Sequence, residues 1–267
     1  MSPPAEPIRD IAHLGHVELL TPKPNESLWY FRDIRAYGDY ATTTLKLTEA
    51  AHPGVGHIAW RCVSPQALAR RAEAIEATGL GLGWSNGDFG HGKCYRFRDP
   101  DGHLMEVYYE EERYEAPEGL RSTLMNLPMK YTGRGVGVRR IDHIALLSKE
   151  VGPNRSFVEQ ALGCTLREQV VYENGTKEIG SWMATNPVHH EIAYVVDVKR
   201  AHGRLHHFSL FVDNRDEVLR AADIMAENDI FIEAGPSKHN NSQAFYLYSY
   251  EPGGNRIEVY TSGFFVF

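Results

Sequence analysis

Short runs in which apolar and polar residues alternate recur along this chain, and turn residues separate them. Alternation with a period of two is typical of half-buried strands, and the runs are rich in β-branched and aromatic residues. Near the C-terminus two such runs flank Glu251-Pro252-Gly253-Gly254, which predicts a hairpin. The pattern predicts strands over 11–20, 41–47, 56–63, 94–98, 104–109, 140–147, 172–183, 191–198, 205–212, 244–250 and 256–260.

Between some of these strands, apolar residues recur at helical spacing. Leu68, Ala72 and Ile75 follow Ser64-Pro65, a good N-cap followed by proline at the first helical position. A second apolar stripe, with Val218, Leu219, Ala222 and Met225, follows an Asp213-Asn214 cap. The pattern predicts helices over 66–78, 154–162 and 26–33, and from Asp213 or Asn214 to about 227.

The order of these elements repeats. In two segments a strand that carries histidine is followed by a capped helix, a hairpin with proline and glycine at its turn, and a glutamate in the return strand. His57 precedes Glu106 by 49 positions, and His207 precedes Glu258 by 51. The repetition predicts an α+β fold in which four βαβββ units form two homologous domains.

The two remaining units match less well. His143 and His207 are 64 positions apart, whereas His16 and His57 are 41 apart, and the 23-residue difference falls between Phe31 and Tyr40. A Pro- and Gly-containing stretch separates the halves. We therefore expect an N-terminal domain over 1–112, a linker over 113–138 and a C-terminal domain over 139–267.

Composition excludes several classes of function. A net charge of −7 and a pI near 6.0 leave no basic surface for nucleic acid. No apolar run reaches the roughly 18 to 20 residues of a membrane helix, so no membrane partner is expected. Cys62, Cys94 and Cys164 are far apart in the chain, which fits reduced thiols in a cytoplasmic protein.

Glu258 is the first candidate for chemistry. It lies between Ile257 and Val259, so strand alternation turns its carboxylate away from those two side chains and toward the enclosed side of the sheet. A buried carboxylate needs a cation, a proton or several donors. His143 and His207 also lie in predicted strands, and two imidazoles with one carboxylate form the facial triad that suits non-haem Fe(II). Three polar residues satisfied within a core are the alternative.

Three further residues could assist such a centre. His190 precedes the strand 191–198, His239 precedes the last hairpin, and Tyr248 lies in the first strand of that hairpin. Imidazole and phenol groups near a metal-bound oxygen donate hydrogen bonds and shuttle protons.

The run from His239 to Glu258 resembles the signature of the type I extradiol ring-cleavage dioxygenases of the vicinal oxygen chelate superfamily. The matching positions are His239, seven spacer residues, Leu247-Tyr248, Glu251-Pro252-Gly253-Gly254 and Glu258, and Ser237 is the one departure from the pattern. The resemblance extends over both halves and is strongest to catechol 2,3-dioxygenases.

The resemblance implies the vicinal oxygen chelate fold and cleavage of a catechol by O₂ beside its diol, giving a 2-hydroxymuconic semialdehyde. It implies Fe(II), with Mn(II) as the alternative, and a homotetramer. It also implies roles for individual residues: metal binding by His143, His207 and Glu258; acid–base catalysis by His190; hydrogen bonding to the substrate by His239 and Tyr248; and lining of the pocket by Trp182.

Relatives that act on carboxylate-bearing catechols have an arginine shortly before the equivalent of His239. Here that stretch is Glu233 to Ser237, with only Lys238 beside the histidine. The sequence therefore favours a neutral aromatic diol as substrate.

Two alternatives stay open on the sequence. A glyoxalase-like metal-dependent isomerase or a metal-free small-molecule binding protein could use the same units. The N-terminal half also has His16, His57 and Glu106 at matching positions, which could hold a second metal. The sequence favours a relic there, because Arg96 stands where the other half has Tyr248.

Overall fold

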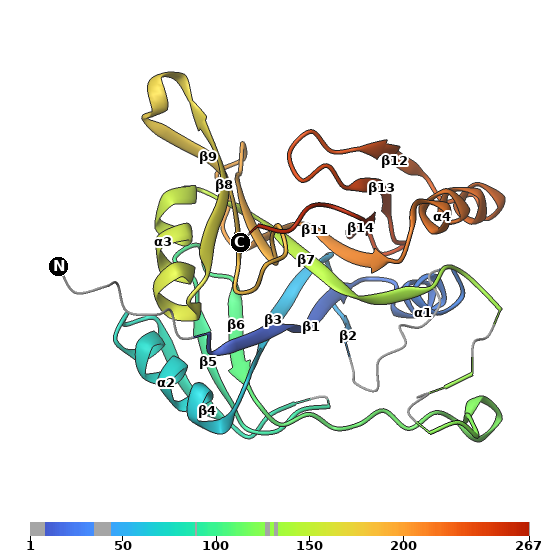
Figure 1. Ribbon diagram of the computed structural model, residues 1–267, viewed down its shortest axis with the longest axis horizontal. Coiled ribbons are helices and arrows are strands. Elements are labelled where there is room, and N and C mark those ends of the chain that lie inside the picture. Colours follow the sequence, from blue (N-terminus) through green and yellow to red (C-terminus); the bar gives the residue numbers. More distant parts are fainter. Residues whose placement is uncertain (1–8, 35–43, 89, 126–128, 131–132, 267) are drawn as a thin grey trace.

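Two mixed sheets form the protein in a computed structural model that describes residues 9–34, 44–88, 90–125, 129–130 and 133–266 (Figure 1). The first sheet has the strand order β2-β1-β3-β6-β5-β4, and the second has the order β12-β13-β14-β11-β7-β10-β9-β8. The first half contains β1 (Ile11–Thr21), α1 (Pro24–Trp29), β2 (Leu45–Glu49), β3 (Gly54–Cys62), α2 (Pro65–Glu76), β4 (Gly81–Ser85), β5 (Cys94–Arg98) and β6 (Leu104–Tyr108).

The second half contains β7 (Val138–Ser148), α3 (Val151–Leu162), β8 (Thr165–Tyr172), β9 (Lys177–Ala184), β10 (Ile192–Val196), β11 (Arg204–Val212), α4 (Arg215–Glu227), β12 (Ile232–Lys238), β13 (Phe245–Tyr250) and β14 (Arg256–Thr261). Among the described residues, no helix has the length and apolar character needed to cross a membrane. The domain limits at 112 and 139 stay a prediction.

The α+β fold with repeated units is confirmed. The order β-α-β-β-β appears in the unit from β3 to β6, in the unit from β7 to β10 and in the unit from β11 to β14. The first unit shows β1, α1 and β2 within the described residues, with a π-helical turn at Tyr30–Ile34 after α1. The predicted irregularity between Phe31 and Tyr40 falls largely on residues 35–43, which lie outside the described part of the chain.

Several predicted boundaries were wrong. The strand expected over 172–183 begins later: Tyr172 is the last residue of β8, a turn follows in which Asn174 has φ 58°, and β9 begins at Lys177. The helix expected from Asn154 begins three residues earlier, at Val151, because Pro153 is accommodated in the first turn of a helix. Strands β4, β8 and β12 were not predicted, and in β4 and β12 the residues Gly81, Gly83, Gly235 and Pro236 interrupt the apolar pattern.

The caps agree with the sequence. Ser64 Oγ accepts a hydrogen bond from Ala67 N at 3.1 Å, and Asn214 Oδ1 accepts one from Glu217 N at 3.0 Å. Helix α3 ends at Gly163, whose φ of 74° is the left-handed conformation that glycine adopts without steric cost.

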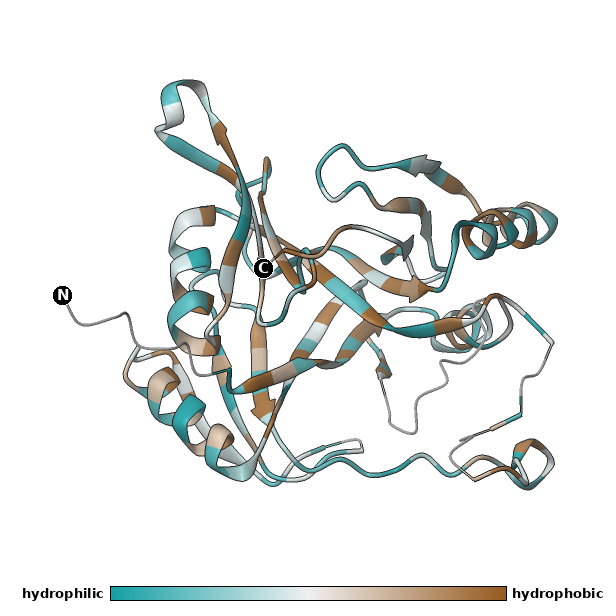
Figure 2. Ribbon diagram, viewed as in Figure 1, coloured by the Kyte–Doolittle hydropathy of each residue, from teal (hydrophilic) through white to brown (hydrophobic). Residues whose placement is uncertain are grey.

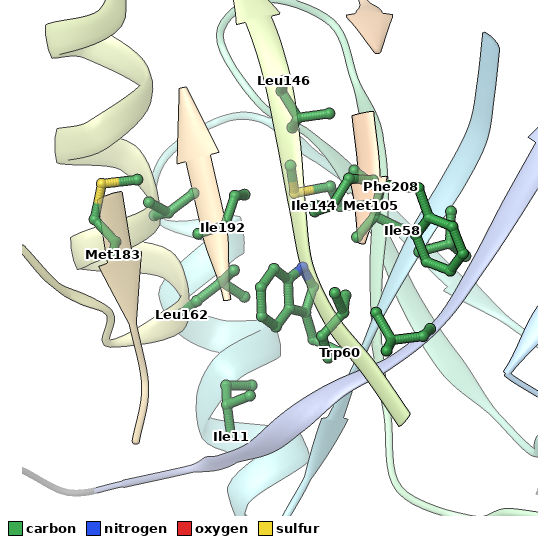
Figure 3. Close-up of a cluster of buried hydrophobic side chains, with 14 of the residues drawn as sticks. Ile11, Ile58, Trp60, Met105, Ile144, Leu146, Leu162, Met183, Ile192 and Phe208 are labelled. Carbon is green, nitrogen blue, oxygen red and sulfur yellow. The ribbon is translucent and has the colours of Figure 1, made fainter. Parts of the chain in front are cut away.

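One apolar core joins the two sheets. Trp60 of β3 is fully buried and belongs to the same cluster as Ile144 of β7 and Phe208 of β11 (Figure 3). Hydrophobic residues accordingly concentrate on the strands where the two halves meet (Figure 2). Helices α2 and α3 lie side by side across this junction, where Arg71 Nη1 donates to Ala161 O at 3.3 Å.

The two hairpin turns interlock the halves. In the first half, Asp99 Oδ1 accepts from the backbone N–H groups of Asp101 and His103 at 3.0 and 2.9 Å, which closes the turn. The other oxygen, Oδ2, accepts from the Tyr194 hydroxyl of β10 at 2.8 Å. The His103 ring bonds to Asp99 Oδ2 at 2.7 Å and to Arg204 O of β11 at 3.1 Å. This turn therefore docks on the second half.

The equivalent turn of the second half docks on the first. Glu251 accepts from the N–H groups of Gly253 and Asn255 at 2.8 and 2.9 Å. Its Oε2 also accepts from the Ser27 hydroxyl at 2.5 Å, and Asn255 Nδ2 donates to Leu20 O at 2.9 Å. Because both turns lead into the strands that carry Glu106 and Glu258, this exchange holds those strands in place.

The His103 contact makes the docking depend on pH. Burial lowers the pKa of His103, but the hydrogen bond that its ring donates to Asp99, the charge of that carboxylate and the contact with Arg204 O together outweigh burial and raise the pKa above 6.5. Protonated His103 therefore favours the folded state, and its contribution is complete below about pH 6.5 and is lost as the pH rises through the folded pKa. We expect the melting temperature of His103→Gln to lie further below that of the wild type at pH 6 than at pH 9. A gap that is constant or widens toward pH 9 would contradict this.

Candidate metal centre

Strand register brings His143, His207 and Glu258 together. In the pairing of β7 with β11, Ala145 lies opposite His207, and in the pairing of β11 with β14, Ser209 lies opposite Glu258. His143 lies two residues before Ala145, and His207 lies two residues before Ser209. Side chains two residues apart in a strand point to the same face, so the side chains of His143, His207 and Glu258 leave adjacent strands on one face. Each of the three is buried.

Their ligand atoms are close enough to share one ion. His143 Nε2 lies 2.9 Å from His207 Nε2, and Glu258 Oε2 lies 3.0 and 3.6 Å from those two nitrogens. First-row divalent ions bind nitrogen and oxygen ligands at about 2 Å, so neighbouring ligand atoms are about 3 Å apart. The three distances fit that spacing, and two nitrogens with one carboxylate oxygen are a donor set for Fe(II) or Mn(II).

The outer nitrogens of both histidines are held. His143 Nδ1 bonds to Asp142 Oδ1 at 2.9 Å, and His207 Nδ1 lies 2.6 Å from His206 Nδ1. With Nδ1–H donated to a carboxylate, His143 turns Nε2 to the centre. Burial lowers the pKa of His143, but Glu258 and Asp142 outweigh it and raise the pKa to about 9, so the metal-free ring is protonated and a bound ion would replace the Nε2 proton. Burial lowers the pKa of His207 well below its ordinary value. Burial raises the pKa of Glu258, but the charge of His143 outweighs it and keeps that carboxyl ionised.

His190 lies against this cluster and connects it to the surface. Its ring centre is 4.0 Å from that of His143, and the side chain is buried. His190 Nδ1 lies 2.8 Å from His189 Nδ1, and His189 Nε2 lies 3.0 Å from Glu168 Oε2, whose side chain is one-third exposed. Burial and the charge of His143 lower the pKa of His190, which favours the neutral ring. The chain of contacts could carry a proton to solvent.

His239 and Tyr248 lie beside the carboxylate. His239 Nε2 is 2.9 Å from Glu258 Oε1 and 3.4 Å from the Tyr248 hydroxyl. Tyr246 stacks on the His239 ring with centres 3.8 Å apart, and Arg256 lies 3.7 Å above the Tyr248 ring. Contacts from Tyr246 and Arg256 of the same hairpin thus hold both candidate side chains.

The structure therefore places five of the seven sequence-predicted residues around one point: His143, His190, His207, His239 and Glu258. A sixth, Tyr248, contacts His239. Trp182 lies on β9 opposite Ala193 of β10, and its contact with a substrate stays a prediction.

Sequence reasoning missed the residues that orient the centre. These are Asp142, His206, His189 and Glu168. Three of them precede a functional histidine directly, in the pairs Asp142-His143, His189-His190 and His206-His207. That adjacency was the available signal. Glu168 had none, because its strand, β8, was not predicted.

Several known proteins are similar to this chain. The profile of the Glyoxalase/Bleomycin resistance protein/Dioxygenase superfamily matches residues 140–259. The chain is 43% identical to a metapyrocatechase from Geobacillus stearothermophilus, over 96% of this chain and 82% of that protein. It is 38% identical to a manganese-dependent 2,3-dihydroxybiphenyl 1,2-dioxygenase from Geobacillus genomosp. 3, over 97% and 87% of the two chains.

Solved structures share the fold. The 2,3-dioxygenase LapB from Pseudomonas sp. KL28 matches with a TM-score of 0.86 at 23% identity, over 97% of this chain and 94% of that one. Homoprotocatechuate 2,3-dioxygenase from Arthrobacter globiformis matches with a TM-score of 0.81 at 23% identity, over 98% and 83%.

Asp142 offers a test of the centre that leaves the ligands intact. The charge of Asp142 orients His143 and makes its Nε2 more basic, and Asp142→Asn removes that charge. We therefore expect the affinity for Mn(II) to fall about 10- to 100-fold. Calorimetric titration of the metal-free protein would measure it. Asp213→Asn is the matched control, since Asp213 is half-exposed and pairs with Arg139 away from the cluster. Equal affinity in both variants would contradict the assignment.

Proposed function

We infer that this chain, which belongs to the type I extradiol dioxygenases of the glyoxalase/bleomycin resistance protein/dioxygenase superfamily, cleaves the ring of a catechol beside its two hydroxyl groups. Both atoms of O₂ enter the product, a 2-hydroxymuconic semialdehyde when catechol is the substrate. The observation that carries this proposal is the convergence of two imidazoles and one carboxylate in a buried site beside His190.

We propose Fe(II) or Mn(II) as the ion that His143, His207 and Glu258 hold. These ligands occupy one side of an ion and leave other positions free. The bound ion would supply Lewis acidity that lowers the pKa values of the catechol hydroxyls, and it would supply a place for O₂. The protein's part is to bind and orient the diol and to move its protons.

His190 would act as the acid–base group. Its neutral ring beside His143 can accept a proton from a substrate hydroxyl, and it can return one when oxygen is reduced. His189 and Glu168 continue the contact chain toward solvent, so a proton need not remain in the buried site.

His239 and Tyr248 would position the substrate from the opposite side. Both have a polar hydrogen next to Glu258, where a diol oxygen bound at the cluster would lie. Burial raises the pKa of Tyr248, so its hydroxyl stays protonated and donates. Trp182 would line the pocket that receives the ring.

We further propose a neutral catechol as the substrate. Arg256, the cation over the Tyr248 ring, is already paired with Glu233 at 2.5 Å. A carboxylate on the substrate would compete with that pair. A homotetramer and a cytoplasmic location complete the proposal, the latter because Cys62, Cys94 and Cys164 are free and buried.

Turnover of catechols by the metal-loaded protein tests the function. Anaerobically purified protein loaded with Fe(II) or Mn(II) should convert catechol to a yellow ring-opened product and consume one O₂ per molecule. We expect kcat/KM for catechol and methylcatechols to exceed that for 3,4-dihydroxyphenylacetate by about tenfold or more, which corresponds to roughly 1.4 kcal/mol. If neither the Fe(II)-loaded nor the Mn(II)-loaded protein cleaved the ring, the proposed function would be refuted. Equal kcat/KM values for catechol and 3,4-dihydroxyphenylacetate would refute only the substrate preference.

His190→Asn separates acid–base catalysis from metal binding. The variant keeps all three proposed ligands, so its metal content per chain should match that of the wild type. Loss of the proton acceptor should lower kcat about 10²- to 10⁴-fold. His52→Asn, at an exposed histidine, is the control and should keep full activity. A His190→Asn variant with wild-type kcat would show that another group moves the proton.

A further inference from the structure

The first half of the protein contains a second cluster of histidines around a buried glutamate. His16 of β1, His57 of β3 and Glu106 of β6 come from strands, and His91 comes from the loop before β5. All four side chains are buried.

Its strand register repeats that of the first cluster. Glu18 lies opposite His57, and Ala59 lies opposite Glu106. His16 lies two residues before Glu18, and His57 lies two residues before Ala59. His143 and His207 have the same offset from Ala145 and Ser209 in the second half. The same backbone geometry therefore directs His16, His57 and Glu106 to a common point in the first half.

The distances between ligand atoms also repeat. His16 Nε2 lies 2.8 Å from His57 Nε2, and Glu106 Oε1 lies 3.5 Å from each of them. His91 Nε2 lies 2.9 Å from the same Oε1, as His239 Nε2 lies 2.9 Å from Glu258 Oε1 in the second half. His16, His91 and Glu106 each offer an atom within 4.8 Å of the other two.

Hydrogen bonds on the outer nitrogens direct lone pairs inward. His57 Nδ1 bonds to Glu18 Oε2 at 2.8 Å, and His91 Nδ1 bonds to Gly92 O at 2.9 Å. When these nitrogens donate, Nε2 of both neutral rings carries a lone pair. His91 Nε2 then faces Glu106 Oε1, and among the described residues neither atom has a hydrogen bond of good geometry. A buried pair of lone pairs requires either an extra proton or a cation between them.

Arg96 does not occupy the position between Glu106 Oε1 and the imidazoles. The sequence favoured a relic because Arg96 replaces Tyr248, and the two do occupy equivalent positions, each opposite the glutamate of its hairpin. However, Arg96 Nε and Cys94 Sγ donate to Glu106 Oε2, at 3.1 and 3.2 Å. The other oxygen, Oε1, remains directed at the three imidazoles.

We propose that His16, His57, His91 and Glu106 bind a second divalent transition-metal ion of the Zn²⁺ class. Tetrahedral bonds of 2.0–2.1 Å place neighbouring ligand atoms about 3.3 Å apart. The three distances among His16, His57 and Glu106 and the distance from His91 to Glu106, 2.8–3.5 Å, lie around that value. Three imidazoles and one carboxylate fill all four positions. The ion is therefore structural, and it leaves no position for substrate or O₂.

The ion would join three strands and a loop of the first sheet. Imidazole-rich sites bind Zn²⁺ more tightly than Fe²⁺ or Mn²⁺, so the two sites would hold different metals. This proposal is independent of ring cleavage, because it concerns the half of the chain that lacks a counterpart of Tyr248.

Zn²⁺ stoichiometry in full-length variants tests the proposal. Metal-free protein is saturated with Zn²⁺, desalted and analysed by mass spectrometry. The double variant His207→Ala/Glu258→Gln, which lacks the first site, should retain one ion per chain. Adding His57→Ala and His91→Ala should reduce this to none. The control adds His52→Ala and His202→Ala, two exposed histidines, and should retain the one ion.

Thermal unfolding supplies the second readout, which holds even if removing the histidines impairs folding. Zn²⁺ should raise the melting temperature of His207→Ala/Glu258→Gln, because an ion bound only to the folded state stabilises it. If that variant retains no Zn²⁺ and shows no shift, the cluster is a proton-sharing network and the proposal is wrong. Loss of the ion in the exposed-histidine control would show adventitious surface binding and would also overturn it.

Discussion

The arrangement of the second half depends on one constraint: the buried negative charge of Glu258 must be neutralised by nearby groups. The side chain is fully buried, and an uncompensated ion in such a place costs several kcal/mol. Two histidines from neighbouring strands face it, and His239 contacts its other oxygen. A divalent cation satisfies all of these groups together, which explains why the rings turn their outer nitrogens to Asp142 and His206.

The interlocked turns make this arrangement rigid. Asp99 and Glu251 each close a turn of their own half and bond to the other half, so neither sheet can shift without breaking buried hydrogen bonds. The strands that follow these turns carry Glu106 and Glu258. Both halves therefore share the register that directs a glutamate inward and the contact that fixes its strand. Opposite that glutamate, the first half has Arg96 and the second has Tyr248.

The repeat and the principal site were readable from the sequence because the signature is local. His239, Tyr248 and Glu258 lie close together in the sequence, and the spacing of His57 and Glu106 resembles that of His207 and Glu258. Contacts between segments far apart in the sequence could not be predicted from it. His91 lies in a loop whose position follows from the pairing of His91 with Glu111 across an isolated bridge, and no short motif marks it. Strand β8, with Glu168, is mostly exposed and lacks clear alternation.

Anomalous scattering from crystals of iron- or manganese-loaded protein tests the central claim most directly. The account predicts a peak at the metal's absorption edge that lies about 2 Å from His143 Nε2, His207 Nε2 and one oxygen of Glu258. A loaded, active crystal in which that position has no peak, or in which the ion is bound by other residues, would contradict it.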